Sequence, residues 1–70
     1  MRKEIKIEGM SCKHCVMHVT EALEEIDGVK NVKVSLEKQN AILEAENVND
    51  EALKKAIEEV GYDVVNIKTI

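Results

Sequence analysis

The stretch KEIKIEGMSCKHCVMHVTEALEEI, residues 3–26, changes its hydrophobic period partway along. Over Lys3–Glu8 isoleucine alternates with charged residues, and this period of two predicts a strand with one buried face. After a short break, apolar residues recur every three or four positions: Val16, Val19, Leu23 and Ile26. That spacing is typical of one buried helix face. The stretch therefore predicts a strand, a loop, and a helix that begins at Lys13 or His14 and extends to Asp27.

The rest of the chain predicts three more strands and a second helix. Apolar alternation over Val32–Leu36 and again over Ala41–Ala45, with turn residues between them, predicts an antiparallel hairpin. Asn49 is a good N-cap for the second helix, and Gly61 is expected to end it. The β-branched stretch Val64–Ile70 predicts the last strand.

The predicted order is strand, helix, strand, strand, helix, strand, the α+β arrangement called ferredoxin-like or split βαβ. In this fold both helices cover one face of a four-stranded antiparallel sheet, and the other face meets water. Gly28 is expected to cap the first helix in the left-handed conformation, and Val60 to face the core from the second. Seventy residues with 44% apolar content predict one domain over residues 1–70 with an aliphatic core.

Composition and charge exclude several classes of protein. Fourteen acidic and ten basic side chains give a formal net charge of -4, so the bulk positive charge that drives nucleic-acid binding is missing. No apolar run has the length of a signal peptide or a membrane span, which predicts no membrane insertion and a cytoplasmic location. The first residue, Met1, and the six complete elements favour a free-standing protein.

The two cysteines of the chain, Cys12 and Cys15, lie at the predicted junction of loop and helix. Thiolates select soft ions or clusters: Cu(I), Zn(II) or iron–sulfur. The spacing of three lets both sulfurs point at one place, and the helix N-terminus with Lys13 is expected to lower the thiol pKa. Structural zinc normally takes four protein ligands, whereas two thiolates suit a low-coordinate monovalent ion. The pair is therefore predicted to hold Cu(I) and to release it.

Three other interpretations of the cysteine pair stay open. A thioredoxin-like redox pair shares the Cys-x-x-Cys spacing, but such folds place a cis-proline beside it and this chain has no Pro. A zinc knuckle or an iron–sulfur site would need cysteines from a second chain. A buried structural pair is the commonest fate of cysteine, although a glycine-led loop before a helix is an unusual place for one.

The motif Gly9-Met10-Ser11-Cys12-x-x-Cys15, opening a helix in a chain of this length and element order, resembles the heavy-metal-associated domain. Within that family the chain is most similar to the small bacterial copper chaperones of the CopZ type, over essentially its whole length. The resemblance implies that Cys12 and Cys15 bind Cu(I) and that Met10 packs beneath the loop without ligating. Ser11 stands where zinc- or cadmium-carrying members often have an acid, which favours copper. Delivery to a copper-transporting P-type ATPase, or to its metal-binding domain, by thiolate exchange and without catalysis is also implied.

Two further residues are expected near the metal. The resemblance places Tyr62 close to the site, where it would shield the metal or hydrogen-bond a sulfur; closing the end of the core is an equal alternative. His14 is expected to tune copper exchange, or to supply a third ligand in a copper-linked homodimer, without being required in the monomer. His18 lies one turn further along the same face, which is predicted to be exposed.

Three alternatives to a free-standing chaperone remain: a metal-binding domain of such an ATPase, a mercury-binding scavenger and, from a different class, a dithiol oxidoreductase. Surface charge bears on transient docking of the chain with a partner. The basic residues predicted to make the metal-binding end less negative are Arg2, Lys3 and Lys13.

Overall fold

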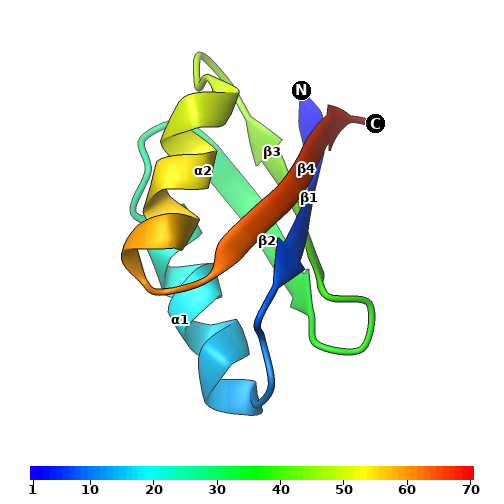
Figure 1. The fold of residues 1–70 in the computed structure, drawn as a ribbon. Coiled ribbons are helices and arrows are strands. Elements are labelled where there is room, and N and C mark those ends of the chain that lie inside the picture. The colour runs from blue at the N-terminus through cyan, green and yellow to red at the C-terminus, as the bar shows by residue number, and fades with distance from the viewer.

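The structure is a computed structural model that describes residues 1–70. Its elements in chain order are β1 (Arg2–Glu8), α1 (Lys13–Glu24), β2 (Val29–Ser35), β3 (Asn40–Ala45), α2 (Asp50–Glu59) and β4 (Asp63–Thr69). The four strands form one antiparallel sheet in the order β2-β3-β1-β4. Figure 1 shows α1 and α2 together on one side of this sheet. The predicted ferredoxin-like fold is confirmed.

The core lies between the two helices and the inner face of the sheet. Its largest fully buried side chains are Ile5, Ile7, Val19, Leu23, Leu43, Leu53 and Ile57. In β1 these are the alternate isoleucines, while the intervening Glu4 and Lys6 lie on the outer face. Burying an aliphatic side chain of this size contributes about 1.5–3 kcal/mol relative to leaving it exposed. The hydrophobic pattern of the strands and helices therefore determines which face each element presents.

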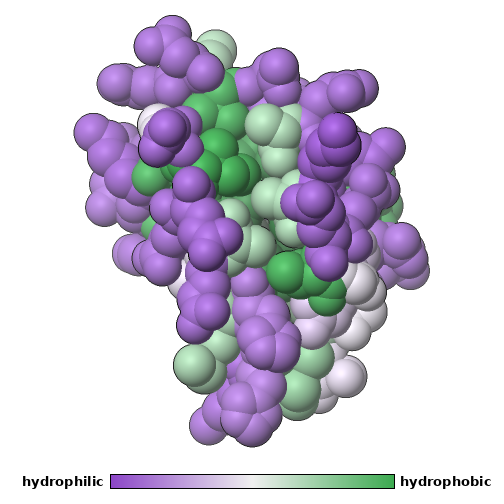
Figure 2. Space-filling view, turned by 90° about the vertical axis from the view of Figure 1, so that its left-hand side faces the viewer, coloured by the Kyte–Doolittle hydropathy of each residue, from purple (hydrophilic) through white to green (hydrophobic).

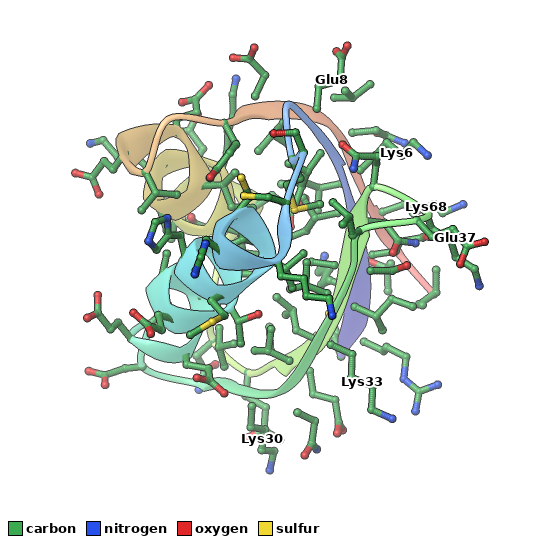
Figure 3. The ribbon with its side chains drawn as sticks, turned by 90° about the horizontal axis from the view of Figure 1, so that it is seen from below. Lys6, Glu8, Lys30, Lys33, Glu37 and Lys68 are labelled. Carbon is green, nitrogen blue, oxygen red and sulfur yellow. The ribbon has the colours of Figure 1, made fainter.

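The outer face of the sheet carries no helix and is largely charged. Seen from the end that carries the cysteine loop, Lys6, Lys33 and Lys68 project from the strands away from the helices (Figure 3). Glu4 lies among them, where its carboxylate accepts from Asn40 Nδ2 at 2.7 Å and lies 3.3 Å from Lys68 Nζ. The hydrogen bond from Asn40, and then the contact with Lys68, lower the pKa of Glu4. The outer face is therefore polar, and on it the Glu4 side chain is fixed by the hydrogen bond from Asn40 and the ion pair with Lys68.

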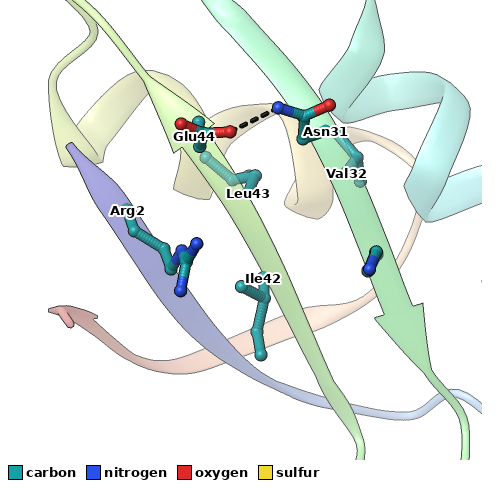
Figure 4. A pocket seen from close by; sticks show the side chains of 7 residues that line it. Arg2, Asn31, Val32, Ile42, Leu43 and Glu44 are labelled. Atoms are coloured by element: carbon teal, nitrogen blue, oxygen red, sulfur yellow. Dashed lines mark hydrogen bonds between the residues drawn. The ribbon is translucent and has the colours of Figure 1, made fainter.

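A shallow groove of about 650 Å³ crosses the outer face between β2 and β3. Figure 4 shows the Asn31 side chain of β2 hydrogen-bonded to Glu44 of β3, with Ile42 further along β3. Asn31 has a φ of +55° and lies where the β2–β3 register shifts, between Lys30 and Lys33. The groove is therefore the surface of a bulge near the termini, and its lining shares no residue with the cysteine loop.

Helix α1 ends at Glu24, three residues earlier than predicted. The chain then tightens, with Ile26 N donating to the Leu23 carbonyl at 3.2 Å, so Ile26 continues the apolar spacing without continuing the helix. Gly28 is left-handed, with a φ of +94°, but it does not cap α1 as predicted. A Cβ there would lie 2.3 Å from the Glu46 carbonyl oxygen. Gly28 is thus required by close backbone approach, where Glu46 N also donates to its carbonyl at 2.9 Å.

The two ends of α2 agree with their predicted caps. Asn49 Oδ1 accepts from Ala52 N at 2.9 Å at the N-terminus. At the C-terminus Gly61 has a φ of +96°, and Tyr62 N donates to the Ile57 carbonyl at 3.3 Å. Val60, predicted to face the core, is 38% exposed because it follows the last residue of the helix. The C-cap at Gly61 ends α2 and is followed immediately by Tyr62.

The outer side of the helix layer has an apolar seam between polar ridges (Figure 2). A shallow hollow is lined by His18, Glu21, Ala22, Glu25 and Val60. No helix of the structure is both long and apolar enough to cross a membrane.

Candidate metal centre

The cysteines lie in the loop that joins β1 to α1, at the end of the molecule away from both chain termini (Figure 1). Gly9 turns the chain out of β1 with a φ of +102°, and the Met10 side chain is buried in the core at 5% exposure. Cys12 is the extended N-cap residue of α1 and is exposed, whereas Cys15 lies in the first helical turn and is half-buried. Met10 therefore anchors the loop in the core, while Cys12 is exposed to solvent.

The backbone and the side chains both bring the two cysteines together. The Cys15 and Val16 amides donate to the Cys12 carbonyl at 3.1 and 3.3 Å. The two Sγ atoms are 3.0 Å apart, within hydrogen-bonding distance and well beyond the 2.03–2.05 Å of a disulfide. Both cysteines are free. The spacing of three at a helix start thus places both sulfurs at one point, as the sequence predicts.

The surroundings of Cys15 favour its thiolate. Hydrogen bonds from the Tyr62 hydroxyl, then from Cys12, then from the Ser11 backbone amide lower the pKa of Cys15 to about 6. The same contact with Cys15 raises the pKa of Tyr62 to about 12, because the phenol is held as a donor. Any contribution of the predicted Lys13 charge to the pKa of Cys15 is smaller than these hydrogen bonds. Near neutral pH the pair therefore presents a thiolate next to a sulfur that can donate to it.

Tyr62 closes the end of the core, which is one of the two alternatives that the sequence left open. Its ring is half-buried and packs against the core, and a Cβ on Gly9 would lie 3.5 Å from its Cδ1 atom. The interaction of its hydroxyl with Cys15, which lowers the pKa of that thiol, agrees with the other alternative. The left-handed Gly61, which ends α2, therefore places Tyr62 beside Gly9 at the start of the cysteine loop.

The remaining predicted residues are not gathered around the sulfurs in one cluster. Ser11, His14 and His18 are all exposed, and no group of three or more His, Cys, Asp or Glu side chains is arranged to hold a metal ion. Arg2 and Lys3 were predicted to make the metal end less negative, and that prediction is wrong. They begin β1, whereas the cysteine loop follows the other end of that strand.

Gln39 is the site neighbour that the sequence pattern did not identify. It belongs to the turn between β2 and β3, yet its Nε2 atom donates to the Met10 carbonyl at 2.8 Å, as well as to the Leu36 carbonyl at 2.7 Å. The contact with Met10 joins residues 29 positions apart. The local pattern marks Gln39 as a turn residue and carries no signal for such a contact.

Comparison with known proteins places this chain in a family. The family model described as the heavy-metal-associated domain matches residues 4–63. The chain is 44% identical over 64 residues to the copper chaperone CopZ of Enterococcus hirae, a match that covers 89% of this chain and 93% of that protein.

Solved structures agree. A CopZ metallochaperone structure is 40% identical with a TM-score of 0.88, covering 93% of this chain and 100% of that one. The Cu(I)-loaded N-terminal domain of a potential copper-translocating P-type ATPase from Bacillus subtilis is 29% identical with a TM-score of 0.83, covering 90% and 81%. The chain therefore belongs to the heavy-metal-associated domain family.

Proposed function

We propose that the chain is a cytosolic copper chaperone in which Cys12 and Cys15 hold one Cu(I) ion as a two-coordinate dithiolate. The observation that carries the proposal is the pair of Sγ atoms 3.0 Å apart at an exposed helix N-terminus. The pKa of about 6 for Cys15 supports it, because thiolate is the form that ligates soft metals. The similarity to the Enterococcus hirae copper chaperone supports copper as the cargo.

The donor set supports Cu(I) over Zn(II). The site supplies two sulfurs from one chain, and soft thiolates with a low coordination number suit a monovalent soft ion. Structural zinc is almost always bound by four ligands. Ser11, directly before the first cysteine, is exposed and neutral and so offers no carboxylate oxygen to a divalent ion.

Release follows from the openness of the site. Cys12 is exposed at the tip, so a thiolate of an acceptor can approach bound copper from the solvent side. As the acceptor forms a Cu–S bond, one Cu–S bond to this chain breaks, and a second such exchange completes the transfer. No oxidation state changes, and the proposal includes no catalytic step. The freed Cys15 sulfur regains the hydrogen bond from the Tyr62 hydroxyl.

The proposed acceptor is a copper-transporting P-type ATPase, or the metal-binding domain of one. The support is the 29% identity and the shared fold with the Bacillus subtilis ATPase domain in its Cu(I)-loaded state. That same similarity favours a second candidate, in which this chain is itself a domain of such an ATPase. The length of the protein detected in cells by an antibody against the chain distinguishes the two.

Cysteine variants test the dithiolate directly. Cys12→Ser and Cys15→Ser are each expected to lose most Cu(I) affinity in anaerobic competition with a Cu(I) chelator. Met17→Ala is the matched control, because Met17 is a 54% exposed sulfur-bearing residue of the same helix. Full affinity in either cysteine variant, or an equal loss in the Met17 variant, would show that the dithiolate is not the site.

His14 carries the remaining part of the proposal. It is exposed and adjoins Cys15 in sequence, so it can reach a copper ion held at the tip of a second molecule. His14→Ala is expected to leave monomer affinity unchanged and to reduce copper-linked dimers in sedimentation. An unchanged dimer fraction and an unchanged transfer rate would remove His14 from the proposal.

A further inference from the structure

We propose that Gln39 is a positioning residue for the metal loop: it fixes the orientation of the Met10–Ser11 peptide, directly before Cys12, and so holds the Cys12 sulfur in place for copper. The inference rests on the proposed function for its copper readout. Its structural part, the orientation of one peptide unit, concerns the metal-free protein alone.

Gln39 donates two hydrogen bonds from its side-chain amide group. One is donated to the Leu36 carbonyl inside the turn at 2.7 Å, and the other to the Met10 carbonyl at 2.8 Å. The contact with Met10 is partly buried, so water competes for it less than at an open surface. Gln39 therefore ties the β2–β3 turn to the loop that carries the cysteines.

The geometry of a trans peptide passes this constraint on to Ser11, the residue before Cys12. The carbonyl of residue 10 and the amide of residue 11 belong to one planar unit and point in opposite directions. With the Met10 carbonyl held by Gln39, the Ser11 amide is held pointing the other way, and Cys12, the N-cap residue of α1, follows Ser11 directly. Partners that orient a ligating group are a common requirement of metal sites. Rotation of this peptide would change the direction in which the chain enters Cys12.

The turn is a firm support for that contact. The Gln39 carbonyl accepts from Ile7 N at 2.9 Å, and the Lys38 carbonyl accepts from Lys6 Nζ at 3.0 Å. Two hydrogen bonds therefore join the turn to β1. Gln39 itself has a left-handed φ of +53°. The β1 end that precedes Gly9 and the turn that carries Gln39 are therefore fixed relative to each other.

Two substitutions in the same turn separate positioning from turn stability. Gln39→Asn keeps a residue that tolerates the left-handed conformation, but it shortens the side chain by about 1.5 Å and so withdraws the amide from Met10. Ser35→Ala removes the hydrogen bond from Lys38 N to Ser35 Oγ at 3.1 Å and leaves Gln39 in place. The second variant is the control for a turn that is merely weakened.

Three measurements on each reduced variant decide the matter: the urea unfolding midpoint, the NMR shift and hydrogen exchange of the Ser11 amide without metal, and Cu(I) affinity by chelator competition. For Gln39→Asn we expect a shifted, faster-exchanging Ser11 amide and about fivefold weaker Cu(I) binding, the loss that one hydrogen bond of ordinary strength supports. For Ser35→Ala we expect an unmoved Ser11 amide and affinity within twofold of the parent chain.

The inference is overturned if Gln39→Asn leaves the Ser11 amide unmoved, if it binds Cu(I) within twofold of the parent chain, or if Ser35→Ala weakens binding equally. A parent chain that does not bind Cu(I) would refute the proposed function instead. In that case the Ser11 amide alone decides whether Gln39 orients the peptide.

Discussion

Tyr62→Phe removes one hydroxyl group from the metal centre and leaves the ring in place. The ring packs against the core and beside Gly9, so the variant keeps the apolar contacts that the ring makes. What is lost is the hydrogen bond to the Cys15 sulfur, the largest single cause of the pKa of about 6. The expected consequence is a higher pKa for the Cys15 thiol, with the hydrogen bonds from Cys12 and from the Ser11 backbone remaining.

The size of the effect follows from the equilibrium. At pH 7 a pKa of about 6 leaves about ten thiolates for each thiol. A hydrogen bond to a charged group shifts such an equilibrium about ten- to a hundredfold, and because Cys15 is only half-buried, water replaces part of it and the lower end applies. The variant is therefore expected to have a Cys15 pKa of about 7, so that about half of the thiol is ionised at pH 7.

The same substitution has a consequence for stability, with a definite sign. The pKa of Cys15 is lower in the folded chain than its ordinary value of 9.0, so the thiolate favours folding. This contribution is fully present above pH 9 and is lost as the pH falls through about 6. The reduced parent chain is therefore expected to gain stability over Tyr62→Phe as the pH rises from about 6 to about 7, and the difference should stay constant at higher pH because both chains have the same unfolded pKa.

The assay is thiolate absorbance in the ultraviolet as a function of pH, under anaerobic conditions and without metal. Cys15→Ser identifies which part of the titration belongs to Cys15. A Cys15 pKa that stays at about 6 in Tyr62→Phe would refute the reasoning, because the phenol would then not be the group that stabilises the thiolate.

Two further predictions concern the scaffold. Gly28→Ala is expected to cost about 2–3 kcal/mol in urea unfolding, from a left-handed φ and a Cβ placed 2.3 Å from the Glu46 carbonyl, whereas Gly61→Ala, with nothing within 4 Å, is expected to cost about 1–2 kcal/mol. Equal losses in the two variants would contradict the close approach at Gly28. Glu4→Gln is expected to lower stability at neutral pH, and the difference from the parent chain should vanish as the pH falls below 4.5, because the pKa of Glu4 is lowered in the folded state and its carboxylate contributes only while ionised. A pH-independent difference in unfolding midpoint would show that the charge of Glu4 is not involved.

Local pattern was sufficient for the element order and for the meeting of the two sulfurs. The alternation of isoleucine in β1 and the three-to-four spacing in α1 each specify one buried face, and those faces determine the layers. The sulfurs meet because N-cap and first-turn positions of a helix are neighbours, which is a property of the helix alone.

The features that were missed depend on the packing of distant segments. Ile26 keeps the apolar spacing of α1 after the helix has ended, so spacing alone places the boundary too late. The requirement for glycine at position 28 arises from the Glu46 carbonyl, 18 positions away, and the role of Gln39 arises from Met10. Lys3 lies at the start of β1, where it contacts Asp50 at 3.2 Å and Thr69 at 2.8 Å, because the strand direction carries it away from the loop.

The most direct test of the central claim is an anaerobic titration of the reduced chain with Cu(I) and, separately, with Zn(II), followed by native mass spectrometry. The proposal predicts one Cu(I) bound per chain, with Zn(II) bound far more weakly. Zn(II) binding as tight as Cu(I), or a chain that takes up no Cu(I) with both cysteines reduced, would contradict it.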